Sequence, residues 1–174
     1  MWFVCKIRYE KVQEDGIQKK VTEQYVVDAL SFTEAETRIM EEMSSYISGE
    51  LASPTSDATR HTESELSSAS LLRQFEVVDI SRAPFGEVFF AEDTMADMWF
   101  KAKLQFITID ENTEREKRSN VTYLVQAASL EGARKNIDEV MGTTMIDYVI
   151  SGLNDTPIMD VFEYTKTEEK PEYE

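Results

Sequence analysis

Hydrophobic and polar residues alternate along two stretches of the chain that both begin with the tripeptide Met-Trp-Phe. On one side of the first stretch lie Phe3, Cys5, Ile7 and Tyr9. The same side of the second stretch holds Phe100, Ala102, Leu104 and Phe106. A period of two is typical of a strand that buries one face. The pattern predicts one such strand at the start of each half of the chain.

These strands belong to a longer repeat. The first block recurs after 97 residues and carries Met1, Trp2, Phe3, Lys6 and Tyr9 onto Met98, Trp99, Phe100, Lys103 and Phe106. A second block recurs after 98 residues, and a third, which contains Pro84 and 87–89, recurs after 73 residues as Pro157 and 160–162. Three blocks in the same order indicate an internal duplication. The smaller last offset means that the first half carries about two dozen additional residues.

Each half is expected to run strand, hairpin turn, strand, helix, strand, short strand. Asp15-Gly16 is a strong hairpin signal. The helices are predicted from stripes at a helical period: Phe32, Ala35, Ile39 and Met43, then Leu130, Ala133, Ile137 and Met141. Ser31 and Glu34 form a capping box, which the second helix lacks because Gly132 replaces the acid. The second helix should therefore be the weaker one, and Gly142 should end it.

One helix on an antiparallel sheet, twice, defines an α+β fold: two ββαββ halves packed about a pseudo-twofold axis. The first repeat is expected over 1–90, a short linker over 91–97, the second repeat over 98–164 and a disordered acidic tail over 165–174. Residues 49–74 are rich in Ser and Thr and are expected to form a mobile insert, within which "ESELSSASLLRQ" favours one short helix.

The net charge of the chain limits the classes of partner that it can bind. The chain has 34 acidic against 18 basic residues, a formal charge of -16. Such a chain is repelled by bulk nucleic acid and by anionic membranes, and it suits solubility, basic partners or mimicry of a polyanion. We find no signal peptide and no apolar run near the roughly 20 residues of a membrane helix. With one cysteine, Cys5, the expected location is a reducing cytoplasm.

Long motifs connect the chain to a known family. They are "MWFVCKIRYEK", "GIQKKVTEQYVVDALSFTEAETRIMEEM", "YISGE", "EVFFAED" and "IMDVFEY". In these motifs the chain resembles an uncharacterised family, a domain of unknown function, found in gut Bacteroidetes and their phages and mobile elements. The resemblance spans nearly the whole chain except roughly 51–74, where the insert departs from the usual pattern. It implies a bacterial or phage cytoplasmic setting and no assigned chemistry.

No catalytic constellation is visible in the sequence. His61 is the only histidine and lies in the Ser/Thr-rich insert, which removes Ser-His, Cys-His and multi-His zinc sites. Cys5 is predicted to be a buried core thiol. "DENTEREKRSNV" spaces its acids as a calcium loop does, but Arg115 and Val121 occupy the Gly and Glu positions, so we interpret it as a charged hairpin tip. We expect no catalytic residue, no metal and no cofactor.

Aromatic and basic residues instead mark a candidate binding surface on the outward side of the two first strands and on the two hairpins. It comprises Trp2, Lys6, Arg8, Lys19, Lys20, Trp99, Lys101, Lys103, Arg115, Lys117 and Arg118. Rings with flanking cations on an open sheet bind single-stranded nucleic acid by base stacking. In the alternative interpretation Trp2 and Trp99 fill the interface between the halves, and the lysines form a solvated face.

Three functions remain open at this stage. The leading one is a non-enzymatic interaction protein of phage or mobile-element type, with a protein partner that it engages through its acidic surface, in a stronger form by polyanion mimicry. The second is single-stranded nucleic-acid binding through Trp2 and Trp99. The third is a small-ligand pocket between the halves. No membrane partner is expected, and exposed strand edges leave a homo-oligomer open.

Overall fold

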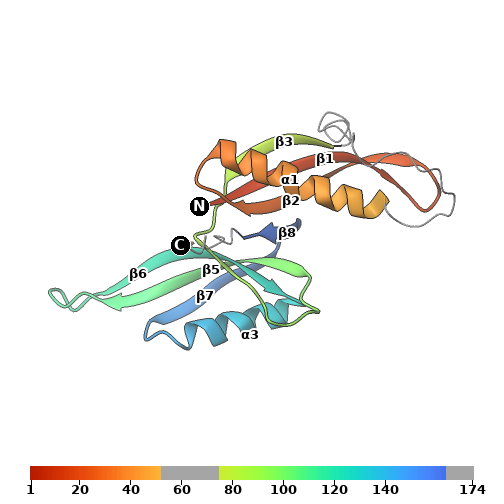
Figure 1. The fold of residues 1–174 in the computed structure, drawn as a ribbon. Coiled ribbons are helices and arrows are strands. Elements are labelled where there is room, and N and C mark those ends of the chain that lie inside the picture. Colours follow the sequence, from red (N-terminus) through yellow and green to blue (C-terminus); the bar gives the residue numbers. More distant parts are fainter. Residues whose placement is uncertain (52–74, 164–174) are drawn as a thin grey trace, which may run out of the picture.

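The computed structural model describes residues 1–51 and 75–163, and these form two four-stranded sheets with one helix on the outer side of each (Figure 1). The α+β class and the order of elements in each half are as the sequence predicts. The first half contains β1 (Trp2–Val12), β2 (Gln18–Asp28), α1 (Phe32–Leu51), β3 (Phe75–Arg82) and β4 (Glu87–Phe89). The second half contains β5 (Met98–Ile109), β6 (Glu116–Ala127), α3 (Leu130–Met141), β7 (Asp147–Asp155) and β8 (Ile158–Phe162).

The duplication extends to the register of the strands. Phe3 of β1 lies opposite Arg82 of β3, and their counterparts Phe100 and Asp155 lie opposite each other in β5 and β7. The register shifts after Lys6 in one sheet and after Lys103 in the other, which places a bulge at corresponding positions. The offsets of 97 and 73 residues, taken from the sequence, therefore describe equivalent positions in space.

The sheets differ from the expectation in one strand each. Their strand orders are β3-β1-β2-β8 and β4-β6-β5-β7, so the short last strand of each half joins the sheet of the other half. β8 runs parallel to β2, and β4 runs parallel to β6, whereas the other neighbours are antiparallel. Each sheet is thus mixed and contains an exchanged strand, rather than being antiparallel and built from one half.

The connection after β3 explains this exchange. The backbone N–H of Ala83 donates to the carbonyl of Trp2 in the first sheet, and that of Gly86 donates to Thr122 in the second. The chain therefore passes from one sheet to the other within a few residues, too few to return beside its own sheet. The alternation of hydrophobic and polar residues along a short strand shows that one face of the strand is buried, but it does not show which other strand pairs with it.

Three apolar clusters hold the structure together. One lies between α1 and its sheet, and a second lies between α3 and its sheet. The predicted stripes supply these two clusters with Ala35, Ile39, Met43, Ala133, Ile137 and Met141, which are all buried, but the first residue of each predicted stripe, Phe32 or Leu130, is exposed. The third cluster joins the inner faces of the two sheets and contains Val26, Phe85, Trp99, Leu124, Ile158 and Val161. β4 and β8 contribute to this inter-sheet core, so the exchange also ties the halves together.

The helix ends follow the sequence closely. The Ser31 hydroxyl accepts from the N–H of Glu34 at 3.2 Å, and the Glu34 carboxylate accepts from the N–H of Leu30 at 2.9 Å. In α3 the Ser129 hydroxyl accepts from the N–H of Gly132, where no acidic side chain can complete a box. Gly142 ends α3 in a right-handed conformation, and an added Cβ would lie 2.9 Å from the Asp138 carbonyl. This glycine is thus required for space rather than for a left-handed turn.

Both hairpins form as predicted. Gly16 has a φ of 80°, which supports the turn between β1 and β2. The "DENTEREKRSNV" segment is the tip of the β5–β6 hairpin, where Glu114 takes the left-handed conformation with a φ of 54°. No helix among the described residues is long and apolar enough to cross a membrane.

The start of the insert needs correction. α1 continues to Leu51, so residues 49–51 are helical and not part of a loop. A single glycine inside a helix costs only about 1 kcal/mol relative to alanine, which is too little for Gly49 to end this helix. The remainder of the predicted insert, with its proposed short helix, and the tail over 165–174 lie outside the residues that the structure describes.

Candidate functional site

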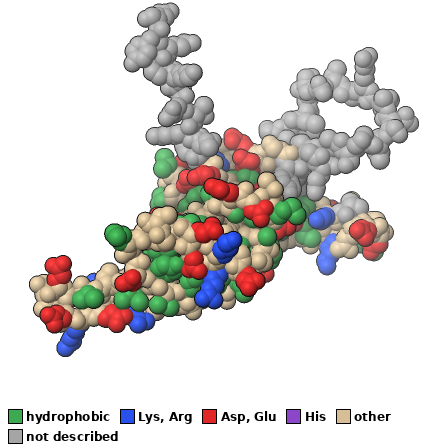
Figure 2. Space-filling model, turned by 90° about the horizontal axis from the view of Figure 1, so that it is seen from below, with side chains coloured by type: hydrophobic (Ala, Val, Ile, Leu, Met, Phe, Trp, Pro, Cys, Tyr) green, Lys and Arg blue, Asp and Glu red, His purple; other side chains and the backbone are tan. Residues whose placement is uncertain are grey.

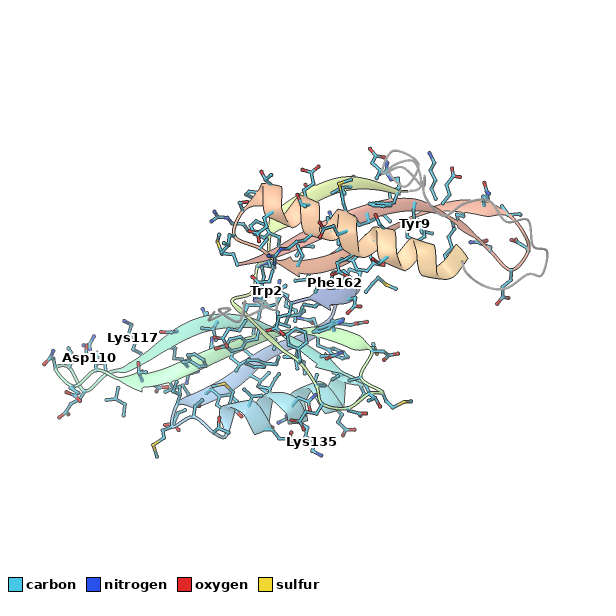
Figure 3. The ribbon with its side chains drawn as sticks, in the orientation of Figure 1. Trp2, Tyr9, Asp110, Lys117, Lys135 and Phe162 are labelled. Atoms are coloured by element: carbon cyan, nitrogen blue, oxygen red, sulfur yellow. The ribbon has the colours of Figure 1, made fainter. Side chains whose placement is uncertain are left out.

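The two tryptophans of the predicted surface lie between the sheets. Trp99 is only 2% exposed and belongs to the inter-sheet core, against which Trp2 packs half-buried. Phe90 contacts both rings, with centroid distances of 6.5 Å to Trp2 and 5.7 Å to Trp99. Figure 3 shows Trp2 where the two halves meet. Base stacking on Trp99 would require the sheets to separate.

The basic residues of the two first strands have acidic or polar neighbours. On the face of the first sheet that faces the second, Lys6 lies opposite Asp79 and Arg8 lies opposite Glu76. In the second sheet Lys101 is half-buried, and Lys103 is exposed. Lys6 and Arg8 thus have carboxylates as cross-strand neighbours, whereas Lys101 and Lys103 lie opposite Asn154 and Gly152.

The basic residues of the hairpins lie at opposite ends of the molecule. Lys19 and Lys20 lie at the tip of β1–β2, and Arg115, Lys117 and Arg118 lie at the tip of β5–β6. The two hairpins point in opposite directions (Figure 1). Arg118 is engaged with Glu116 at 3.1 Å and with Gln105 at 3.3 Å. The predicted surface thus comprises the tryptophans between the sheets, basic side chains on the faces of β1 and β5, and basic side chains near the ends of two distant hairpins.

A groove that the sequence analysis did not identify lies between α3 and β7. Its volume is about 780 Å³, and it extends along β7 from Tyr148 to Leu153. The helix lines it with Leu130, Glu131, Arg134 and Asp138. β7 is the outermost strand of its sheet, so the groove borders a sheet edge with no further strand beside it in the described part of the chain. The inter-sheet region, by contrast, is packed with apolar side chains.

One hydrogen bond ties the walls of the groove together. The Tyr148 hydroxyl donates to Oδ1 of Asp138 at 2.6 Å. This hydrogen bond, together with partial burial and the negative charge of Asp138, raises the pKa of Tyr148 to about 12. The phenol therefore stays protonated and keeps the strand and helix joined across the neutral pH range.

The corresponding positions of the first half are apolar. The counterpart of Tyr148 is Phe75, which is 6% exposed and belongs to the core under α1. Asp138 corresponds to Met40, which packs against that same core. A polar pair beside an open groove in one half thus replaces an apolar contact in the other. In the sequence, this difference between the halves is visible at positions where the two copies of the repeat have unlike residues, and not at positions where they match.

The groove presents charge and hydrogen-bonding groups: one guanidinium, two carboxylates and a phenol. Within the described residues, no three His, Cys, Asp or Glu side chains gather in a way that could hold a metal ion. Cys5 is fully buried in the first core, and burial, with a smaller effect of the Asp79 charge, raises the pKa of its thiol to about 12. That thiol is therefore held in its unreactive form.

Acidic side chains on the face that carries α3 are dispersed. Figure 2 shows them singly and in small groups, with basic and hydrophobic side chains between them. A polyanion mimic requires a continuous array of negative charge. This face does not supply one.

These features define a duplicated α+β protein with an exchanged strand and a groove between α3 and β7 of the second half. The family described as domain of unknown function DUF4494 matches the chain over residues 1–63 and 52–164. The chain belongs to this family. The two matches overlap within the segment that was expected to be an insert. No curated protein and no solved structure matches the chain.

Proposed function

We propose that this protein is a non-enzymatic interaction protein that binds an extended segment of a partner protein in the groove between α3 and β7. The observation that carries the proposal is the difference between the halves. The groove lies beside the Tyr148–Asp138 pair, whereas the corresponding residues of the first half, Phe75 and Met40, pack with the apolar core under α1. A polar pair that replaces apolar core residues in one copy of the repeat supports a role for that copy.

The geometry suits strand addition. An outermost strand offers unpaired backbone N–H and C=O groups, which an extended peptide can bind as a further strand. Side chains at alternate positions of that peptide would point toward α3 and enter the groove. A volume of about 780 Å³ lies within the range of known binding pockets and has room for several side chains.

The proposed setting is the cytoplasm of a bacterium or of a phage-infected cell, where the protein would serve a phage or mobile element. Support comes from the resemblance of the long sequence motifs and from the acidic composition, which favours a basic protein over nucleic acid as a partner. Polyanion mimicry is not part of the proposal, because the face with the groove lacks a continuous acidic surface.

A pull-down with matched variants tests the proposal. The tagged protein is incubated with lysate of a gut Bacteroidetes species, with and without nuclease treatment, beside Ser151→Arg and Val78→Arg. Ser151 lines the groove at the bulge of β7, and Val78 occupies the corresponding exposed bulge of β3. Both variants add one positive charge at equivalent positions, but only Ser151→Arg places a long side chain in the groove.

We expect a protein that is retained by the wild type and by Val78→Arg and is lost with Ser151→Arg. Retention that disappears after nuclease treatment would indicate a nucleic-acid partner and contradict the proposal. Equal behaviour of the two variants would place any binding outside the groove and would contradict it as well.

A further inference from the structure

The charges around the groove indicate what kind of segment it accepts, and this inference rests on the proposed function. Two carboxylates, Glu131 and Asp138, project from α3 on the groove side. Two more, Asp147 and Asp155, stand at the two ends of β7 and are exposed. Arg134 is the one basic side chain among the residues that line the groove. Glu131 and Asp138 outnumber Arg134 among the residues that line the groove, and Asp147 and Asp155 add a carboxylate at each end of β7, whereas Lys103 lies beside Gly152 on the neighbouring strand.

The middle of the groove is largely apolar. Leu130 is 51% exposed at its helix wall, and Ile150 and Leu153 are half-buried along the strand wall. Apolar side chains of a bound segment would therefore be buried at the centre, and polar or charged side chains would lie at its ends.

A second copy of this chain does not fit the groove. Antiparallel pairing of two β7 strands centred on Ser151 would place Asp147 of each copy opposite Asp155 of the other. Like charges directly opposite each other destabilise a strand pair. Each copy also carries a formal charge of -16, so the two copies repel each other.

We infer that the groove binds an extended basic segment of another protein, with apolar side chains at alternate central positions and Lys or Arg at both ends. β7 has nine residues, so a segment of about six to nine residues spans it. The terminal cations of that segment pair with Asp147 and Asp155 and with the carboxylates of α3. Arg134 opposes this attraction, so its removal strengthens binding.

Selection from a display library tests this inference on the intact protein. A library of random dodecapeptides is selected against the wild type, and the enriched peptides are synthesised. Their binding is measured by fluorescence anisotropy, and the site is located by hydrogen exchange of the β7 amides. Enriched sequences should carry basic residues on both sides of an alternating apolar stretch, and added salt should weaken their binding.

Charge variants give the sharper readout. Glu131→Lys should weaken binding of the enriched peptides about three- to tenfold, and Arg134→Glu should strengthen it by a similar factor. The matched control is Glu36→Lys on α1, which makes the same charge change at an exposed helix position of the first half. It should leave affinity within about twofold.

The outcomes separate the inference from the proposed function. If no peptide is enriched, or if Ser151→Arg binds the peptides as well as the wild type does, both fail. If the peptides protect β7 but are neutral or acidic, the inference fails while the proposed function stands. Equal weakening by Glu131→Lys and Glu36→Lys would reduce the effect to net charge and overturn the inference. A dimer that Ser151→Arg dissolves would assign the groove to a second copy and overturn it too.

Discussion

The two halves of this chain share their strand register and the buried stripe of their helix, yet they differ where the helix meets the outermost strand. In the first half Phe75 is 6% exposed, and Met40 packs against the same core. In the second half Tyr148 and Asp138 make a hydrogen bond beside an open groove. The buried positions that stabilise the fold are thus equivalent in the two halves, whereas the positions beside the groove differ. The first half can therefore serve as the comparison when the role of the groove in the second half is tested.

The largest expected effect concerns the two tryptophans. Trp99→Ala should lower the free energy of unfolding by about 3–5 kcal/mol, because it empties the centre of the inter-sheet core. Trp2→Ala should cost clearly less, because its side chain is only half-buried. Urea unfolding followed by circular dichroism measures both. Equal losses would show that the halves contribute symmetrically to the interface.

Alanine substitutions in the buried stripes of α1 and α3 should lower the free energy of unfolding by similar amounts. Ile39 and Ile137 are each 0% exposed at equivalent positions, so replacing either with Ala should cost about 2–5 kcal/mol. Because each sheet contains a strand of the other half, both variants should shift one cooperative transition. Coincident unfolding curves by fluorescence and circular dichroism check this. Two separate transitions, each moved by one variant only, would contradict it.

Exchanging the aromatic residues tests the divergent site directly. Phe75→Tyr should cost about 1–3 kcal/mol, because it buries a hydroxyl where Met40 replaces the carboxylate acceptor. Tyr148→Phe should cost less, about 0.5–1 kcal/mol, because its hydrogen bond is exposed. Thermal unfolding of both variants gives the comparison. A costlier Tyr148→Phe would mean that the polar pair, rather than the apolar core, holds the groove wall.

The same pair predicts a pH effect. The folded pKa of Tyr148, about 12, lies above its ordinary value of 10.0. The hydrogen bond therefore contributes its full stability below pH 10 and loses it as the pH rises through about 12. The difference in phenolate absorbance between the wild type and Tyr148→Phe should have its midpoint near 12. A midpoint near 10 would show that the bond to Asp138 does not form in solution.

Only a small stability change is expected at Cys5, whose counterpart in the repeat is Ala102. Both side chains are 0% exposed, so Cys5→Ala should cost only about 1 kcal/mol. With its pKa raised to about 12, the native thiol should not react with a disulfide reagent at pH 8 until the protein unfolds. A cysteine introduced at Ala102 is the matched control and should be equally inert. Rapid labelling of either thiol in the folded protein would contradict the burial.

Features of this fold that depend on neighbouring residues in the sequence could be predicted, whereas features that depend on contacts between distant segments could not. Ser31 caps its helix, the Ile39 and Ile137 stripes are buried, and both hairpins form, because each follows from a short window of sequence. The exchange of β4 and β8 does not follow, because pairing between strands distant along the chain leaves no trace in local alternation. The continuation of α1 to Leu51 was missed because the start of the insert was placed from composition, and composition does not locate a helix end to within a residue or two.

The site was less predictable than the fold. Trp2 and Trp99 share one face of their strands with Lys6 and Lys103, and periodicity cannot tell whether that face meets solvent or another sheet. The groove depends on how α3 lies over β7, which is a tertiary relation. Only the mismatch of Tyr148 with Phe75 marked it in the sequence, and its meaning required the aligned register of the two sheets.

The exchanged strand β8 also has a consequence for synthesis. During translation the first half can form β1, β2, α1 and β3 early, but β2 lacks its outer neighbour until Ile158–Phe162 have left the ribosome. Until then the edge that carries Tyr25–Val27 is open to pairing with other nascent chains. The first sheet therefore cannot be completed until β8 of the second half has been synthesised.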